Sequence, residues 1–224
     1  MVPSVQTPDF SRRLWEVFDL EASNMAVLTV ARNAHVYNCG DEDLAVYLVE
    51  RGRVKTVTYS QDGKKCLLSI YGPGDVFGEL CLLPGRRTET ATAMRASTIR
   101  RIPAVRFRCA LQDAELMRSF LRHLTVRVDE QRRTITDLVM MDGEHRLAVV
   151  LLRLAWKLGR PEPDGIVLDQ RITQEELSEM VGTTRSRVGY FLKQFAGSGL
   201  VRRTADGRIV VNEHELMRYV NSGA

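Results

Sequence analysis

Residues 172–203 read ITQEELSEMVGTTRSRVGYFLKQFAGSGLVRR, and this stretch predicts a helix–turn–helix. Thr173 can cap a first helix over residues 174–180, because its hydroxyl accepts hydrogen bonds from the free amides of a first turn. Gly182 then permits the tight turn that separates two helices.

The second predicted helix begins after Thr183 and Thr184, whose hydroxyls can cap its first amides. One face has apolar residues at i, i+3, i+4 and i+7, which predicts a buried stripe of Val188, Phe191, Leu192 and Phe195. The opposite face carries Arg185, Ser186, Gly189, Tyr190 and Lys193. Two amphipathic helices joined by a glycine also occur in all-helical cores. A short helix with a cationic, hydrogen-bonding outer face, however, fits the major groove of DNA.

Positive charge is concentrated in this part of the chain, although the whole chain carries a net charge of only +4. From Thr183 to Arg208, Asp206 is the one anion among six cations: Arg185, Arg187, Lys193, Arg202, Arg203 and Arg208. Asp206-Gly207 is a hairpin-turn signal between β-prone segments at 200–204 and 208–211. A hairpin directly after a cationic helix indicates a winged helix with double-stranded DNA as its partner.

Residues 25–108 predict an antiparallel β domain, because short segments of alternating polarity follow one another with no helical segment between them. The clearest strands are Ala45–Glu50, Val54–Thr58 and Lys65–Ile70. Turn signals at residues 40–41, 51–52, 61–63 and 72–75 are expected to break the strands.

Residues 111–141 contain neither glycine nor proline and predict one long helix. Its apolar residues are spaced alternately by four and three: Met117, Leu121, Leu124, Val128, Ile135 and Leu138, with Gln131 in the one gap. A helix packed on its own domain carries a wider stripe, so this narrow seam favours a two-stranded coiled coil and a homodimer. A second helix over residues 144–158 is expected to end at a breaker over residues 160–165.

The remaining composition excludes several classes of function. Neither the cysteines (Cys39, Cys66, Cys81 and Cys109) nor the scattered histidines have the spacing of a metal site or a catalytic triad. We therefore expect four reduced, semi-buried thiols and no enzymatic activity. The chain also lacks an apolar run long enough to span a membrane and an N-terminal secretory signal, so we expect a cytoplasmic protein with no membrane partner. Residues 1–9 are expected to form a loose tail.

Residues 74–93 read GDVFGELCLLPGRRTETATA. Together with the long helix and the C-terminal motif, they resemble the cyclic-AMP receptor protein family of bacterial regulators, also called the Crp-Fnr family. The resemblance extends over residues 25–212. Gly78-Glu79-Leu80 resembles the start of the family's phosphate-binding cassette, and Arg87-Thr88 resembles its end.

The resemblance implies an α+β chain with three parts. These are a β jelly roll of the cyclic-nucleotide-binding type over residues 1–109, a dimerisation helix over 110–141 and a winged helix over 142–224. It implies a homodimeric, sequence-specific transcription regulator that binds a palindromic operator, has RNA polymerase as a partner and is gated by a cyclic nucleotide such as cyclic AMP. An alternative keeps the DNA binding but is effector-free or senses redox state or another small molecule. A regulatory nucleotide-binding subunit is a third hypothesis, against which the basic winged helix argues.

Carried over to this chain, the cassette implies a contact for each part of the nucleotide. Glu79 would accept from the ribose hydroxyl, the turn at residues 80–82 would present amides, and Arg87 would pair with the phosphate. The implied effector residues are Gly78, Glu79, Leu80, Cys81, Arg87, Thr88, Gln131 and Arg132. The last two occupy positions where cyclic-AMP-binding members carry a hydroxyl pair, so the preferred base stays open.

The spacing from Glu79 to Arg87 is one residue shorter than in typical members. An alignment without a gap instead puts Glu89-Thr90-Ala91 at the family's Arg-Ser-Ala position, where a glutamate would repel phosphate. The gapped alignment is preferred here, because Gly85-Arg86-Arg87-Thr88 is a familiar ending of this loop.

The implied DNA-contacting residues are Thr173, Thr183, Thr184, Arg185, Ser186, Arg187, Tyr190 and Lys193. Arg185 matches a position that reads guanine through its bidentate guanidinium. Ser186 stands where many members have a glutamate, and Tyr190 replaces a further arginine. We therefore expect the operator to differ from the usual family consensus.

Overall fold

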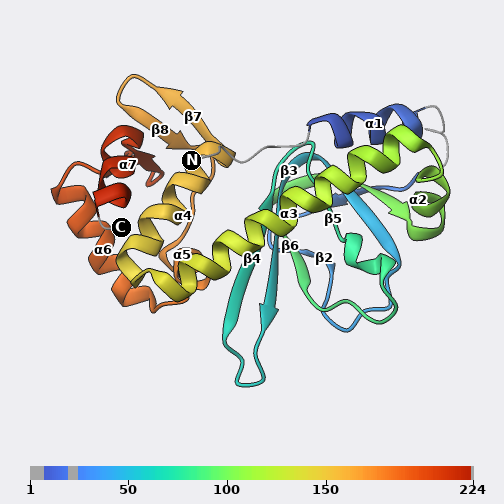
Figure 1. Cartoon of the computed structure of the whole chain (residues 1–224). Helices are drawn as coiled ribbons and strands as arrows, with labels where there is room; N and C mark the ends of the chain where they lie inside the picture. Colours follow the sequence, from blue (N-terminus) through green and yellow to red (C-terminus); the bar gives the residue numbers. More distant parts are fainter. Residues whose placement is uncertain (1–7, 20–24, 223–224) are drawn as a thin grey trace. The chain divides into compact units, whose positions relative to one another are not determined.

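The computed structural model describes residues 8–19 and 25–222, and the chain divides into two compact units, residues 6–128 and 129–224. The division falls within the long helix α3 (Ala114–Met140), which is green to yellow in Figure 1.

The N-terminal unit is built on an antiparallel sheet, as the alternating segments predict. Its strands pair in the order β1-β6-β3-β4, and β2 and β5 pair with β6 and β3. They are β1 (Val27–Val30), β2 (His35–Tyr37), β3 (Ala45–Tyr59), β4 (Lys65–Tyr71), β5 (Val76–Phe77) and β6 (Thr90–Pro103). The rings of Tyr37, Tyr47, Tyr71 and Phe77 pack together between the strands. The predicted β jelly-roll domain is confirmed.

Strand β3 continues through Arg51-Gly52, where the sequence predicts a break. The register with β6 shifts there instead of ending. A Cβ atom at Gly52 would lie 2.5 Å from the Cα of Ser97, and the Ser97 hydroxyl accepts from the amide of Arg53 at 3.0 Å. The glycine therefore serves the close approach of two strands rather than a turn.

Helix α1 (Pro8–Asp19) covers part of the expected N-terminal tail, of which residues 1–7 lie outside the described residues. Phe10, Leu14 and Phe18 recur at intervals of four, and all three are buried. They pack against α2 (Ala104–Ala110) and the first turns of α3. The amphipathic spacing was present in the sequence, so the tail prediction is wrong for residues 8 and 9.

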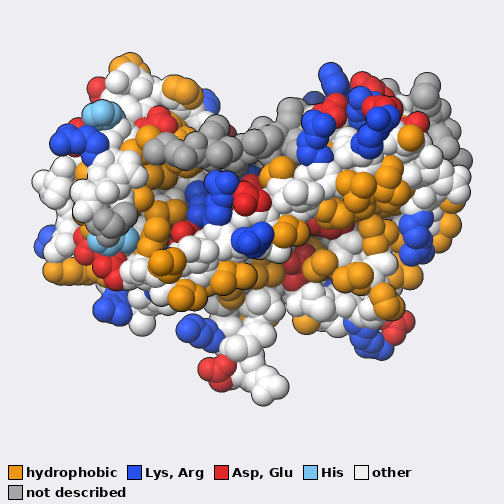
Figure 2. Space-filling model, viewed as in Figure 1, with side chains coloured by type: hydrophobic (Ala, Val, Ile, Leu, Met, Phe, Trp, Pro, Cys, Tyr) orange, Lys and Arg blue, Asp and Glu red, His pale blue; other side chains and the backbone are white. Residues whose placement is uncertain are grey.

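The long helix begins at Ala114, three residues after the predicted start, because Asp113 Oδ1 accepts from the amide of Leu116 at 2.8 Å and caps the first turn. Its exposed apolar residues are Met117, Leu121, Val128, Ile135, Leu138, Val139 and Met140. Figure 2 shows hydrophobic side chains along the course of α3. Leu124, however, packs on the core of its own unit. Leu124 therefore takes one position of the seam into an intramolecular contact, whereas the other apolar positions of the seam are open.

In the C-terminal unit, α4 (Gly143–Leu158) begins at the cap Asp142 and packs against α5 and α7. The four-stranded sheet has the order β7-β8-β10-β9. The remaining elements are β7 (Gly159–Glu162), β8 (Gly165–Leu168), α5 (Gln174–Val181), α6 (Arg185–Gly197), β9 (Val201–Arg203), β10 (Ile209–Val211) and α7 (Glu213–Ser222). The predicted breaker at residues 160–165 is therefore part of a β hairpin. Its two prolines made this segment resemble a loop in the sequence.

All four cysteines are free thiols. Cys81 is buried, whereas Cys39, Cys66 and Cys109 are exposed, which corrects the expectation of four semi-buried residues. Within residues 8–19 and 25–222, no group of three His, Cys, Asp or Glu side chains could hold a metal ion. In the same residues, every helix is too short or too polar to cross a membrane.

Candidate functional site

Helix α5 has the predicted N-terminus. The Thr173 hydroxyl accepts from the amide of Glu176 at 3.1 Å, and the Glu176 carboxylate accepts from the Thr173 amide at 2.9 Å, which makes a reciprocal capping box. Gly182 ends the helix with a φ of 70°, the left-handed conformation that favours glycine. The turn of the helix–turn–helix is confirmed.

Helix α6 is capped by Thr184, whose hydroxyl accepts from the amide of Arg187 at 3.3 Å. Thr183 lies in the turn instead, where its amide donates to the Ser178 carbonyl at 3.2 Å. Of the predicted stripe, Val188, Leu192 and Phe195 are buried and Phe191 is half-buried.

The outer face of α6 presents donors and acceptors. Its exposed side chains are Arg185, Ser186, Arg187, Tyr190 and Lys193. Tyr190 is 59% exposed, and its hydroxyl accepts from Gln194 Nε2 at 2.6 Å, so Gln194 orients the phenol. The first turn of α6 has no acidic residue. A positive helix N-terminus with two arginines attracts phosphate and can reach base edges.

The predicted hairpin follows α6 as β9 and β10, which pair antiparallel through Arg203 and Ile209. Arg208 pairs with Asp206 at 2.7 Å and Arg202 pairs with Asp164 at 3.4 Å. Both acids are exposed, so these pairs are weak and can exchange for phosphate.

Arg146 of α4 connects the helix–turn–helix to the end of α3. Its Nε donates to the Val181 carbonyl at 3.0 Å, and its Nη1 donates to the Met141 carbonyl at 2.5 Å and the Leu138 carbonyl at 3.4 Å. These acceptors are at the C-terminal ends of α5 and α3, where carbonyls lack partners within the helix.

The second candidate site surrounds the cassette in the N-terminal unit. The short 3-10 turn η2 (Glu79–Leu82) follows Gly78, and β6 begins directly after Glu89. Within η2, Cys81 is buried, Leu80 is 51% exposed, and the Cys81 amide donates to the Gly78 carbonyl at 3.1 Å. The amide of Cys81 is thus already used within the protein. Thr88 is exposed, and its carbonyl accepts from the Thr58 hydroxyl at 3.4 Å.

The Arg87 guanidinium is buried; both Nη atoms contact protein groups, whereas Nε has no acceptor among the described residues. Nη1 donates to the Gly78 carbonyl at 2.6 Å, and Nη2 contacts Asp43 Oδ2 at 2.7 Å and the Ala45 carbonyl at 2.5 Å. The guanidinium carbon also lies 4.1 Å from the centre of the Tyr37 ring. The pairing of Arg87 with a phosphate stays a prediction, and a bound phosphate would have to displace or share these contacts.

Asp43 holds two arginines, since Arg101 also contacts it at 2.7 Å. Burial opposes ionisation of Asp43, but hydrogen bonds from Arg87, Arg101 and Tyr47 outweigh burial and lower its pKa. Asp43 was not foreseen in the sequence, because nothing in its local pattern distinguishes it from the other acids of the same loop.

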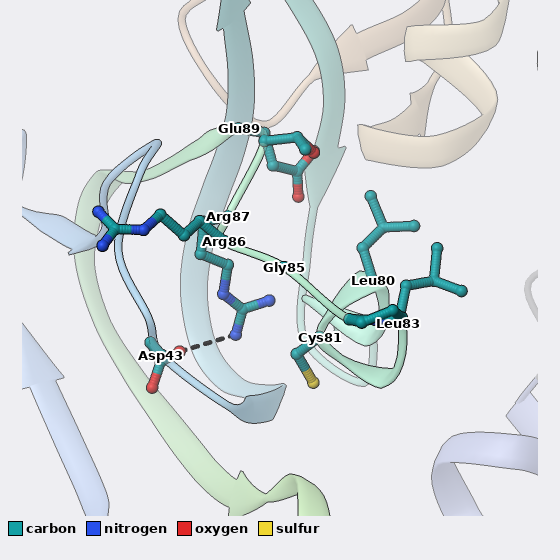
Figure 3. A pocket seen from close by; sticks show the side chains of 10 residues that line it. Asp43, Leu80, Cys81, Leu83, Gly85, Arg86, Arg87 and Glu89 are labelled. Carbon is teal, nitrogen blue, oxygen red and sulfur yellow. Dashed lines mark hydrogen bonds and ion pairs between the residues drawn. The ribbon is translucent and has the colours of Figure 1, made fainter.

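Glu89 is the cassette residue whose carboxyl group is buried beside Glu79. Figure 3 shows it pointing away from the Arg87–Asp43 pair. Its Oε1 accepts from the Tyr37 hydroxyl at 2.8 Å. Burial raises the pKa of Glu89, the Tyr37 hydrogen bond lowers it, and the charge of Glu79 raises it further. In the ungapped alignment, Glu89 stands at the position where typical members of the family carry an arginine. On that alignment, a carboxyl group occupies this interior position in the present chain.

Arg127 of α3 is a further member of this cluster. Its Nη2 lies 3.7 Å from Glu79 Oε1 and donates to the Tyr71 hydroxyl at 2.8 Å. Sequence reasoning selected Gln131 and Arg132 on this helix and missed Arg127, although it precedes Gln131 by one helical turn and so shares its face. Gln131 and Arg132 are exposed on α3 and belong to the other unit, so their role stays a prediction.

A cavity of about 130 Å³ lies within the cassette. It is lined by Asp43, Leu80, Cys81 and residues 83–89. Pockets for whole small molecules usually measure about 300–1,000 Å³. This cavity is smaller than such pockets, and a more open cavity of about 720 Å³ shares Cys81 and residues 83–86 with it.

Comparison with known proteins identifies both domains. The cyclic nucleotide-binding domain model matches residues 27–114, and the Crp-like helix-turn-helix domain model matches residues 145–219. The structure of a CooA mutant from Carboxydothermus hydrogenoformans aligns with a TM-score of 0.77 at 24% identity, covering 92% of this chain and 95% of that one. The c-di-GMP responsive global regulator CLP of Xanthomonas campestris aligns with a TM-score of 0.74 at 20% identity, covering 88% and 98%. At these identities the likeness shows the fold.

Two curated relatives are similar over most of their length. The CRP-like cAMP-activated global transcriptional regulator of Mycobacterium tuberculosis (strain H37Rv) is 32% identical over 213 residues, which cover 89% of this chain and 93% of that protein. The global nitrogen regulator of Synechococcus elongatus is 29% identical over 174 residues, covering 76% and 78%. With both domain models and this extent of identity, the chain belongs to the Crp-Fnr family of transcription regulators.

Proposed function

We propose that this regulator acts in the cytoplasm as a homodimer that binds a palindromic operator through α6. The observation that carries the proposal is the exposed face of α6, where Arg185, Ser186, Tyr190 and Lys193 stand beside a capped, positive helix N-terminus. In a two-fold dimer, the two copies of α6 would enter major grooves about 34 Å apart, one turn of DNA. The open apolar seam of α3 supports the dimer.

The same proposal assigns effector binding to the interior of the N-terminal unit. Glu79, Glu89 and Arg127 form a polar cluster there in a domain of the cyclic nucleotide-binding type. The Mycobacterium tuberculosis relative is described as cAMP-activated. A cyclic nucleotide is therefore the first effector class to test, and RNA polymerase is the expected protein partner of the DNA-bound dimer.

A second candidate function is the same regulator without a nucleotide effector. It is favoured by Arg87, whose guanidinium is held by Asp43 and two carbonyls, and by the small cavity beside it. Both candidates share the DNA-binding surface and differ only at the cassette.

The test begins with selection of bound sites from a random DNA pool, followed by gel shifts on the selected operator. We expect a two-fold symmetric site and a complex that is lost on scrambled DNA. Addition of cyclic AMP or cyclic GMP should change the operator affinity under the first candidate and leave it unchanged under the second. Failure to select any sequence would contradict both.

A further inference from the structure

One cluster of charged side chains in the N-terminal unit contains as many acids as arginines. Three acids and three arginines interact there: Asp43, Glu79, Glu89, Arg87, Arg101 and Arg127. Asp43 takes Arg87 and Arg101, both at 2.7 Å. Near η2, Arg127 is therefore the arginine that faces the carboxyl groups of Glu79 and Glu89. Glu89 also accepts a hydrogen bond from the neutral hydroxyl of Tyr37.

An incoming phosphate would disturb this balance. A cyclic phosphate carries one negative charge, and it would meet the buried carboxylates of Glu79 and Glu89 with Arg127 as the arginine beside them. Arg87 offers little compensation, because Asp43 already neutralises its charge and both Nη atoms donate to Asp43, Gly78 and Ala45; among the described residues its buried Nε alone has no acceptor. Like charges at short range in a poorly hydrated interior repel strongly, so one of them must be neutralised.

We propose that Glu89 decides the charge that this site accepts: its ionised form excludes a phosphate, and its protonated form admits one. The inference rests on the proposed function, in which the cluster is the effector site. The protonated carboxyl group can donate to a phosphate oxygen, whereas the carboxylate can only accept. A cyclic phosphate would therefore bind together with one proton, and binding would be tighter at acidic pH.

Glu89 is suited to this role by its surroundings. The charged and titratable groups that act on it come from every element packed around it: Tyr37 on β2, Tyr71 on β4, Glu79 on η2, Arg87 on its own segment and Arg127 on α3. Burial favours the neutral form of Glu89, and its pKa is raised as a result. Tyr37 and Tyr71 stay protonated, since burial raises both of their pKa values.

The experiment compares the wild-type dimer with Glu89→Gln, which has the same shape and no charge at any pH. Cyclic AMP is titrated by calorimetry between pH 5.5 and 8.0. Wild-type affinity should fall by up to about tenfold per pH unit as pH rises, with uptake of one proton on binding. Glu89→Gln should bind with an affinity that changes little with pH and exceeds that of the wild type at pH 8.

Two controls isolate Glu89. Glu42→Gln removes a carboxylate whose side chain is 75% exposed in the same unit, and it should keep the wild-type slope. The slope that survives in Glu89→Gln is the second control, because it belongs to groups other than Glu89.

The outcomes separate the inference from the proposed function. Equal slopes in the wild type and Glu89→Gln, or wild-type affinity independent of pH, would overturn the inference and leave nucleotide sensing intact. Absence of binding by both proteins at every pH would overturn the inference together with nucleotide sensing, while operator binding would still support the effector-free candidate. Proton uptake by the wild type is read in two buffers of different ionisation enthalpy, so the inference stays testable even if the variant is unstable.

Discussion

Replacement of Arg146 by alanine should weaken the C-terminal unit more than replacement of a surface arginine. The guanidinium donates to carbonyls at the ends of two helices, Val181 of α5 at 3.0 Å and Met141 after α3 at 2.5 Å. Both acceptors carry the negative end of a helix dipole, which strengthens their attraction for a cation. No amino acid other than arginine offers three N–H donors in one rigid plane, so these three hydrogen bonds are lost with the guanidinium.

The magnitude follows from these contacts. A hydrogen bond from a charged group contributes roughly 1.5–3 kcal/mol, so the two short bonds set an upper limit of roughly 6 kcal/mol. The side chain is half-buried, and water can satisfy the released carbonyls in part. We therefore expect Arg146→Ala to lower the free energy of unfolding by about 2–3 kcal/mol. With a urea m-value of about 2 kcal/mol/M, the midpoint should fall by roughly 1 M.

The assay uses one tryptophan as a reporter. The chain has two, and Trp15→Phe leaves Trp156 on α4, whose Nε1 donates to Glu213 at 2.6 Å and so reports on the C-terminal unit. In this background, Arg146→Ala is compared with Arg218→Ala, which removes an exposed arginine paired with Glu215 at 3.1 Å. Arg146→Lys keeps the charge and should recover only part of the loss. A midpoint for Arg146→Ala equal to that for Arg218→Ala would refute the reasoning.

Further predictions concern DNA binding, dimerisation and the cassette. Arg185→Ala should cost about 1–3 kcal/mol of operator binding and relax specificity at one base pair per half-site, and equal weakening on all sequences in gel-shift competition would make Arg185 a phosphate contact. Val128→Asp places a charge on the open seam of α3, where the side chain is 53% exposed, and should give monomers by light scattering; a persistent dimer would exclude this interface. Arg87→Leu should cost about 3 kcal/mol in urea unfolding, because Asp43 loses a buried partner; a loss below about 0.5 kcal/mol would match a surface pair instead. At pH values between the ordinary carboxyl pKa of 4.5 and the raised pKa of Glu89, the folded chain keeps the Glu89 carboxyl protonated, whereas the unfolded chain releases that proton. Its stability should therefore fall as pH rises through this window, and Glu89→Gln should remove that component of the pH profile.

The helix–turn–helix was predictable because its determinants are local. Thr173, Gly182 and Thr184 act on residues within one turn, and the apolar stripe of α6 repeats at helical spacing, so each signal lies within a short window. The same reasoning recovered the long helix and the segments of β3 and β4 that it named, although it divided β3 at Arg51-Gly52. It failed for the hairpin β7–β8, where Pro161 stands on β7 and Pro163 in the turn, and for α1, whose pattern was present but left unused.

The cassette was not predictable in the same way, because its chemistry depends on which of several neighbouring charged side chains points inward. Arg86, Arg87 and Glu89 lie within four residues, and the loop geometry sends them to different surroundings. Arg86 is exposed and contacts Glu42. Arg87 pairs with Asp43, which lies on a loop that is distant in the sequence, and Glu89 accepts a hydrogen bond from Tyr37. Each partner is more than 40 positions away in the chain, so no local pattern reports it.

This distribution of charges bears on how the family can vary its effector while it keeps its fold. The sheet and η2 hold the cassette in place largely through backbone pairing and apolar packing, neither of which involves the Glu89 carboxylate. A single residue ahead of β6 can therefore reverse the sign of the interior charge at little cost to the framework, provided that a neighbour such as the Tyr37 hydroxyl remains to satisfy it. We therefore expect the identity of residue 89, more than the shape of the domain, to determine whether an anion enters and at which pH it does so.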